Sequence, residues 1–225
     1  MFSFDKKLCL LNSIYIFMLS SPCLHAENTG NKLVIGDFSS GSIDQWESKS
    51  FKDETKYQLT QLDGTTVLKA ESAQSASGLF KKQRIDLKKT PILNWRWRTE
   101  NQLGNINEQA KSGDDYTARV YVVVSGGLAF WDTKAINYVW ASTSPKGKVW
   151  PNAYAIDDSM TMIALRSSKD KTGNWYTEKR NILADLKQFI GENIDYIDAV
   201  AIMTDTDNSK GAAVTYYGDI YFTEN

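Results

Sequence analysis

The chain has 225 residues, of which 42% are hydrophobic and 24% are charged, and its formal net charge at pH 7 is −1. This composition argues against a disordered chain, and the near-neutral charge argues against a partnership with nucleic acid or an anionic membrane surface. Seven Trp and eleven Tyr are many for this length. Aromatic residues favour strands and also stack on sugars, so their number does not distinguish a structural role from a sugar-binding role.

The first 26 residues have the layout of a secretion signal. Lys6 and Lys7 form a short positive region, residues 8–19 are mostly apolar, and Ala26 is a small residue at a cleavage point. The apolar run of about 12 residues is too short to cross a bilayer, which needs about 20. We expect residues 1–26 to be removed on export and residues 27–225 to work in the periplasm or outside the cell, without a transmembrane segment. The alternative is a buried core helix.

Cleavage after Ala26 would change the chemistry of the mature chain. It would remove both cysteines, Cys9 and Cys23, and the only histidine, His25. The mature chain could then form no disulfide, no thiol nucleophile, no Ser-His-Asp triad and no imidazole-bound zinc site. Any catalysis would have to use carboxylates, Lys, Tyr, Ser or an oxygen-bound metal.

Short strand-like runs follow one another along the rest of the chain. Asp63-Gly64 lies between two of them and predicts a hairpin turn. The run at 79–87 is of mixed polarity, so one of its faces should meet solvent, whereas residues 99–114 and 205–211 are polar and predict loops. The predicted strands are residues 33–38, 57–62, 67–70, 79–87, 92–98, 119–124, 136–141, 160–166, 175–180, 199–204 and 214–222.

One helix is predicted at residues 182–190. Ile182, Leu186 and Ile190 recur at helical spacing, and Gly191 follows as a stop. No internal repeat or linker divides the chain. Many strands, short turns and one helix predict an all-β fold, in which a single domain forms a two-sheet antiparallel β-sandwich of jelly-roll type.

Several segments read together resemble a known bacterial family. They are residues 94–98, 113–121, 136–140, 175–181, 201–208 and 217–222. They are similar to the secreted proteins catalogued as domain of unknown function 3047, over roughly residues 34–223. The resemblance implies an exported protein of unknown function and supplies no catalytic residues.

The two ends of the expected domain resemble galactose-binding-like jelly rolls. Asp37-Phe38 with Trp46 opens the domain, and residues 218–222 close it. Many carbohydrate-binding modules and the intermediate-associated assembly factors have that fold. Such modules often end in a paired-acid motif that helps to hold a structural calcium, and here Gly218 stands in place of the first acid, which leaves Asp219.

Period-two alternation separates polar from apolar side chains on several predicted strands. Trp95 and Trp97 share one face, and Arg96 and Arg98 share the other. The Trp pair is expected in the core, and the Arg pair faces solvent, ion pairs or a ligand with carboxylate, phosphate or hydroxyl groups.

A second polar face joins Asp115, Arg119 and Tyr121, opposite an expected core face that begins at Tyr116. Glu178 and Arg180 repeat the pairing of an acid with an arginine. If these strands pair, the four charged groups would form a patch for sugar hydroxyls or an anionic sugar. Surface ion pairs or a buried ion network are the alternatives.

An aromatic platform is predicted from Tyr138 and Trp140, which share a strand face and could stack on a sugar or pack in the core. The candidate ligand-binding residues are therefore Arg96, Arg98, Asp115, Arg119, Tyr121, Tyr138, Trp140, Glu178 and Arg180.

Asp205, Asp207, Asn208 and Asp219 offer oxygen ligands for a structural calcium. The loop after Asp205 departs from the helix-loop-helix calcium pattern, because Lys210 stands where glycine is needed. The alternative is a loop closed by Asx turns. Apart from this calcium no cofactor is expected.

The sequence thus predicts an exported, non-catalytic module that binds a saccharide or glycan-like ligand. One alternative is a carboxylate-based enzyme acting on envelope or extracellular polysaccharide, with its acids among Asp115, Glu178, Asp205 and Asp207. The other is an assembly or interaction protein, which would show a flat apolar patch.

Overall fold

The computed structural model describes residues 32–126, 133–155, 159–191 and 193–225. The predicted signal at residues 1–26 lies outside the described residues, so its removal stays a prediction. Within these ranges, no helix has the length and apolar character needed to cross a membrane.

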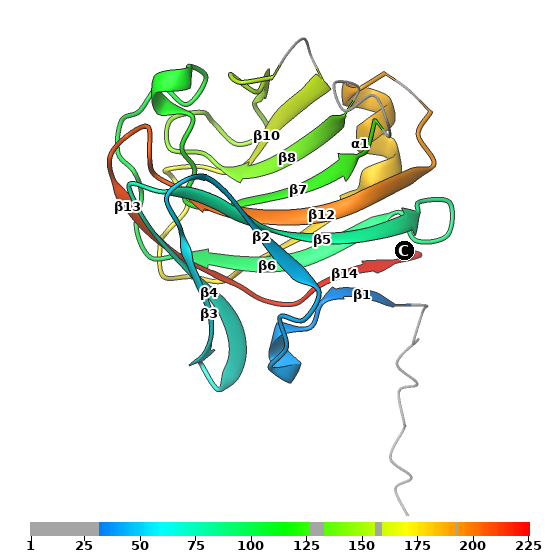
Figure 1. The fold of residues 1–225 in the computed structure, drawn as a ribbon. Coiled ribbons are helices and arrows are strands. Elements are labelled where there is room, and N and C mark those ends of the chain that lie inside the picture. Colours follow the sequence, from blue (N-terminus) through cyan, green and yellow to red (C-terminus); the bar gives the residue numbers. More distant parts are fainter. Residues whose placement is uncertain (1–31, 127–132, 156–158, 192) are drawn as a thin grey trace, which may run out of the picture.

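Two sheets pack face to face and confirm the all-β sandwich (Figure 1). Sheet A contains β1 (Leu33–Gly36), β14 (Ile220–Thr223), β6 (Ile92–Thr99), β13 (Ala212–Tyr217), β4 (Thr65–Ala73) and β3 (Lys56–Leu62) in that order, with β11 (Tyr176–Asn181) paired to β6. Sheet B contains β2 (Trp46–Lys52), β5 (Ala76–Asp86), β12 (Tyr196–Asp205), β7 (Arg119–Val124), β8 (Lys134–Trp140), β10 (Met160–Arg166) and β9 (Val149–Pro151).

One strand pair corrects the expectation of purely antiparallel sheets. Strands β8 and β10 run parallel, with Ile136 opposite Thr161 and Tyr138 opposite Ile163. A parallel pair needs a long connection, and residues 141–159 supply it by passing through β9, which pairs antiparallel with β10.

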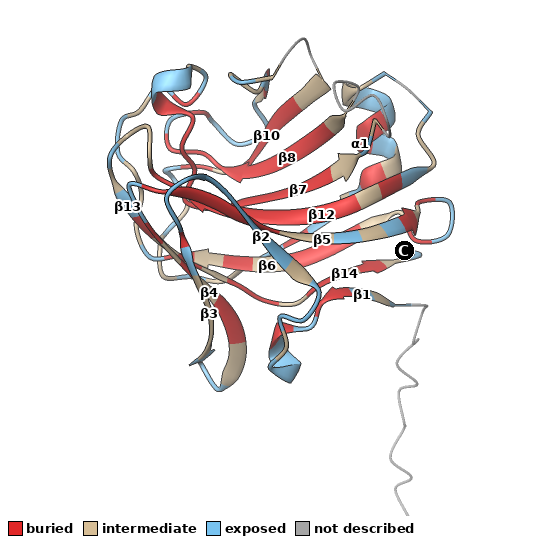
Figure 2. Cartoon of the chain, in the orientation of Figure 1, coloured by how far each residue is buried: buried red, intermediate tan, exposed pale blue. Residues whose placement is uncertain are grey.

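The main core lies between the sheets and takes the apolar side chains of alternating strand positions. On β6, Trp95 and Trp97 are buried in it with their rings 5.5 Å apart, as the alternation predicts. Trp95 also lies 5.4 Å from the ring of Tyr138 on β8, so the aromatic side chains of the two sheets interlock. Figure 2 shows the buried residues running along β6, β7, β8 and β12, whereas β2 is largely exposed.

The predicted helix is present as α1 (Ile182–Phe189). Asn181 caps it, because its Oδ1 accepts a hydrogen bond from the Ala184 amide at 3.0 Å. Ile182 and Leu186 are fully buried in the main core, which explains the helical spacing of the apolar residues.

The outer face of sheet B, meaning the face turned away from sheet A, carries its own apolar clusters. One contains Tyr121 and Met203, and the other contains Val139 and Met162. Strand register aligns one row of this face directly across the sheet: Phe80, Ala201, Tyr121, Asn137 and Met162 on β5, β12, β7, β8 and β10.

Candidate functional site

A groove of about 560 Å³ opens on the outer face of sheet B, near its β2 edge. Grooves of this size fall within the range that holds small ligands. Its lining residues come from β2, β5 and β12 and from β7 with the residue that follows it: Glu47, Ser48, Lys49, Phe80, Lys82, Val123, Ser125, Asp198 and Ala199.

Phe80 gives the groove an aromatic wall. It is partly buried, and its ring meets the ring of Tyr121 edge-on with centroids 5.6 Å apart. The contact holds the Phe80 ring in place, because edge-to-face pairs are a favoured aromatic geometry. Apolar contact in this groove is therefore concentrated beside Phe80, Val123 and Ala199.

Charged groups of both signs surround this aromatic wall. Lys82 pairs with Glu47 at 2.7 Å, and Asp198 accepts a hydrogen bond from the Ser125 amide at 2.9 Å. With Lys49, the groove has two cations and two anions, so its formal charge is balanced. Such a lining offers donors and acceptors without a strong preference for a charged ligand.

A second, shallower pocket of about 420 Å³ lies among the loops at one end of the sandwich, and all its lining residues are uncharged. Below it the buried carboxylate of Glu108 accepts hydrogen bonds from the amides of Ser142, Thr143 and Ser144. These bonds fix the loop that carries Ser142 and Thr143 into the pocket. The pocket is lined by Gln102, Gly104, Asn105, Ser142, Thr143 and Ser168.

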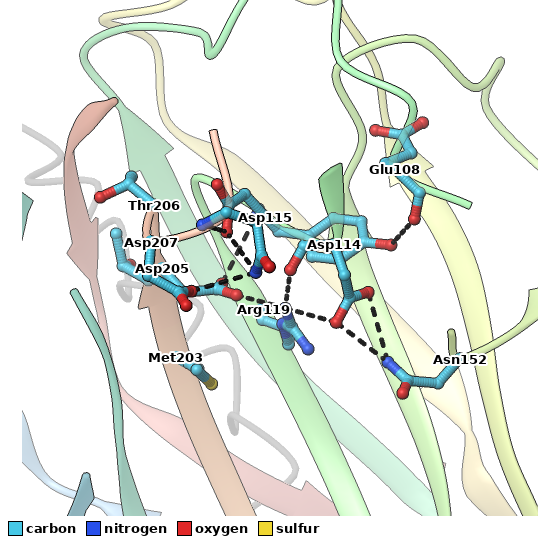
Figure 3. Close-up of polar contacts among 12 residues, drawn as sticks. Glu108, Asp114, Asp115, Arg119, Asn152, Met203, Asp205, Thr206 and Asp207 are labelled. Carbon is cyan, nitrogen blue, oxygen red and sulfur yellow. Dashed lines mark hydrogen bonds and ion pairs between the residues drawn. The ribbon is translucent and has the colours of Figure 1, made fainter. Parts of the chain in front are cut away.

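Arg119 lies at the centre of a buried acid cluster on the outer face of sheet B (Figure 3). Its Nη2 is 2.5 Å from Oδ2 of Asp205 and 3.2 Å from the Asp114 carbonyl oxygen, to which it donates. The guanidinium also lies over the Tyr116 ring, 4.5 Å from its centroid. These contacts make Arg119 part of the fold, and its Nε is enclosed without a partner among the described residues.

The acid cluster holds more carboxylates than Arg119 can neutralise. Burial raises the pKa of Asp205 well above its ordinary value and also raises that of Asp114, while the nearby guanidinium opposes both shifts. Desolvation also raises the pKa of Asp207, and the neighbouring Asp115 adds to this shift. The acid cluster is defined by Asp114, Asp115, Asp205 and Asp207.

Three of these acids are close enough to hold one cation. Oxygens of Asp115, Asp205 and Asp207 lie within 4.8 Å of one another, and carboxylate oxygens are suitable ligands for calcium. The predicted set of calcium ligands therefore changes. Asp115 joins it, and Asp219 leaves it, because the Asp219 carboxylate accepts hydrogen bonds from the backbone and hydroxyl of Ser39.

Asn208 supports the acid cluster. Its backbone N–H and its side-chain Nδ2 each donate to Asp115 Oδ1 at 3.2 Å. Its own Oδ1 accepts a hydrogen bond from the Tyr154 hydroxyl. The Ser209 amide donates to the other oxygen of Asp115. The backbone of this loop therefore holds the Asp115 carboxylate. This arrangement is closer to a loop closed by Asx-type hydrogen bonds than to the predicted role of Asn208 as a calcium ligand.

The structure does not bring the predicted polar patch together. Arg119 belongs to sheet B, whereas Glu178 and Arg180 lie on β11 in sheet A. Glu178 accepts hydrogen bonds from Trp97 and Arg166, and Arg180 pairs with Asp185. These contacts are the structural ion networks that the sequence left as an alternative.

The predicted aromatic platform is also corrected. Tyr138 and Trp140 are buried in the main core, and the Tyr138 hydroxyl donates to Asp185 at 2.6 Å. Their ring faces are packed against other side chains, which leaves no surface for a sugar. Tyr116 departs from its expected core face as well, since it stacks with Trp150 in an outer-face cluster.

Arg96 and Arg98 lie on the outer face of sheet A and are partly exposed, so they are far from the groove in sheet B. Arg96 lies over the Trp175 ring at 4.6 Å, and Arg98 pairs with Glu100 at 2.6 Å. Both cations are already engaged by the protein. Of the predicted ligand residues, Tyr121 alone lies beside the groove, in contact with Phe80.

The sequence patterns do not assign Phe80 or Asn137 to the candidate ligand-binding residues. A signal for Phe80 existed in the mixed polarity of residues 79–87, which predicts a solvent-facing side. Asn137 is a polar residue in the middle of a β-branched and aromatic run, which could have marked it as a special position on an otherwise apolar strand face.

Several solved structures are distantly similar to this chain. The glycoside hydrolase domain of Endo-D from Streptococcus pneumoniae R6 is 12% identical, with a TM-score of 0.38 over 80% of this chain, and this chain spans only 22% of it. TmCBM61, solved with β-1,4-galactotriose, is 11% identical, with a TM-score of 0.41 over 84% of this chain and 94% of its own. A family 29 carbohydrate-binding module is 8% identical, with a TM-score of 0.39 over 87% of this chain and 90% of its own. At these scores the likeness carries no argument about a ligand.

No curated protein matches the sequence. The family described as "Protein of unknown function (DUF3047)" matches residues 44–221, which include strands of both sheets and every residue that lines the groove. The chain therefore belongs to the DUF3047 family.

Proposed function

We propose that this chain is an exported, non-catalytic binding module whose ligand is a saccharide or a glycan-like molecule. The observation that carries the proposal is the groove on the outer face of sheet B, where the partly buried ring of Phe80 lies among charged and hydroxyl side chains. An aromatic ring can stack on the apolar face of a sugar, and polar groups around it can bind the hydroxyls.

The charge and burial of the candidate groups support binding over catalysis. The groove has balanced charges, which suits a ligand that is rich in hydroxyls and carries no strong charge. Asp115 and Asp205 are enclosed and bonded within the protein, so neither is presented to a substrate in the manner of a glycosidase acid pair.

The test is a glycan array followed by calorimetry, with the purified wild-type chain and two variants. Phe80→Ala removes the aromatic wall of the groove, whereas Phe51→Ala removes an exposed aromatic ring that does not line it. We expect specific saccharide binding by the wild type and by Phe51→Ala, and a loss of at least tenfold in Phe80→Ala. Absence of binding to any glycan by a folded wild-type chain would reject the proposal.

Export is the second part of the proposal and is tested separately. Expression of the whole chain in a bacterium should yield a periplasmic or secreted product whose first residue is Glu27. A product that stays in the cytoplasm with Met1 retained would show that residues 1–26 are not a signal.

A further inference from the structure

Tyr121 differs from three other buried tyrosines in its hydrogen bonding. The hydroxyls of Tyr116, Tyr138 and Tyr217 donate to Glu108, Asp185 and Met203, respectively. Tyr121 is also buried, although 8% of it is exposed against 0% for the other three, and its hydroxyl has no partner among the described residues. The hydroxyl oxygen is not one of the fully buried polar atoms that lack a partner, so it reaches solvent on the outer face, where a ligand can bond to it.

Gly78 leaves space beside this hydroxyl. A Cβ atom at position 78 would lie 3.3 Å from the Phe80 ring, 3.4 Å from the Tyr121 hydroxyl and 3.0 Å from the Ile202 carbonyl oxygen. Any side chain here would therefore fill the space between the ring and the hydroxyl. Glycine in the interior of a strand often marks such a close approach.

Asn137 is the next polar group in the same row. It is the register partner of Tyr121 across β7 and β8, and only 5% of it is exposed. Within the described parts of the chain, no hydrogen bond is made by its side-chain amide. Two neighbouring outer-face positions thus carry largely buried side chains whose polar ends reach solvent and make no hydrogen bond within the described ranges.

The row from Phe80 to Asn137 crosses four strands, β5, β12, β7 and β8. Three strand spacings of about 4.8 Å give a length of about 14 Å, which is longer than one sugar ring. We propose that the binding site continues from the groove at Phe80, past Tyr121, to Asn137, and that it takes an extended, uncharged saccharide chain lying across the strands. This inference rests on the proposed function.

The polar groups of the row select the class of saccharide. A tyrosine hydroxyl and an asparagine amide each donate and accept, as a sugar hydroxyl does, whereas a carboxylate can only accept. Arg119 is the neighbouring outer-face residue of β7, two positions before Tyr121, but Asp205 and Asp114 already surround its charge. The row from Tyr121 to Asn137 therefore adds no free positive charge that would favour a uronic acid or a sulfated sugar, and the formal charges of the groove at Phe80 are balanced.

The first experiment measures affinity against chain length in the full-length chain. The probes are neutral gluco- and galacto-oligosaccharides of one to six units, with a galacturonic acid series as the acidic counterpart. We expect affinity to rise with length in a neutral series and to be weaker in the acidic one. Asn137→Leu should lose about tenfold for the long oligomers and little for the shortest, since one hydrogen bond contributes about that factor.

The second experiment needs no ligand. Because the Tyr121 hydroxyl bonds to none of the residues that the structure describes, Tyr121→Phe should leave the Tm unchanged or raise it. Tyr217→Phe is the matched control and should lower the Tm, since it removes a buried hydroxyl bonded to the Met203 carbonyl and to Thr204.

The outcomes separate this inference from the proposed function. A Tyr121→Phe chain destabilised as much as Tyr217→Phe would show that the hydroxyl serves the fold, and would overturn the inference. Saccharide binding that depends neither on the length of the oligosaccharide nor on Asn137 would reject the extended site. It would leave the proposed function as a saccharide-binding module intact. Absence of all saccharide binding would reject both.

Discussion

Arg119 shows how one residue can look like a binding group in the sequence and act as a structural group in the protein. Alternation correctly places it on the same face as Tyr121, opposite Val120 and Val122. Its main partner, Asp205, is 86 positions away, so no local pattern could reveal the ion pair. The same limit applies to Glu178, which meets Trp97 and Arg166 only through the tertiary fold.

Loss of the Arg119 guanidinium should destabilise the chain strongly. Arg119→Met leaves Asp205 and Asp114 buried without their cation, so we expect the free energy of unfolding to fall by about 3–5 kcal/mol. Urea unfolding followed by tryptophan fluorescence measures it. The double variant Arg119→Met/Asp205→Asn should lose less, because it removes a stranded charge. An equal loss in both would contradict the buried ion pair.

Asp114 should make stability depend on pH. Burial raises its folded pKa above the unfolded value of about 3.9, so the folded state binds the proton more tightly. Its contribution to stability is therefore full below the unfolded pKa and is lost as the pH rises through the folded pKa. Asp114→Asn should flatten this fall, relative to wild type, in unfolding measurements between pH 4 and pH 7. An unchanged slope would contradict the raised pKa.

At the level of elements, the sequence predicts most strands but not all their limits. Runs rich in β-branched and aromatic residues were found, and 119–124 and 160–166 coincide with β7 and β10. Strand β2 was missed because its exposed residues carry Lys, Ser and Glu without an apolar face. The predicted run 214–222 divides into β13 and β14, since Gly218 and Asp219 break the pairing.

Gly218 also shows why the interruption between β13 and β14 is hard to predict from composition. A Cβ atom there would lie 2.5 Å from the Arg96 side chain, so the position needs glycine for a contact with a distant strand. The calcium resemblance treated Gly218 as the replacement of an acid, whereas the structure gives it a packing role beneath Arg96. Local patterns do not contain that information.

The turn between β3 and β4 provides a test at this scale. Asp63 and Gly64 have φ angles of 52° and 77°, which lie in the left-handed region. Gly64→Ala should lower the free energy of unfolding by about 1 kcal/mol, because alanine is strained there. Asp63→Asn should cost less, since asparagine tolerates this conformation. Equal thermal stability of wild type and Gly64→Ala in differential scanning calorimetry would argue against the turn.

For the whole molecule, the acid cluster predicts a response to calcium. A cation bound by Asp115, Asp205 and Asp207 would join the start of β7 to the loop after β12 and would offset the excess negative charge. The Tm should rise with added calcium and return to its starting value with a chelator. Asp207→Asn should abolish the rise, whereas Asp219→Asn should keep it, because Asp219 binds Ser39. A Tm that calcium does not change would contradict the predicted metal site.

The pairing of β1 with β14 sets an order for the completion of the fold. Leu33 lies opposite Phe222, and β14 separates β1 from β6, so the earliest strand finds its neighbour only among the latest residues. While the chain is being synthesised, β1 must stay unpaired and sheet A must keep an open edge. A chain that leaves the cell unfolded would benefit from this delay, because the sandwich cannot close before the end of the domain has been made.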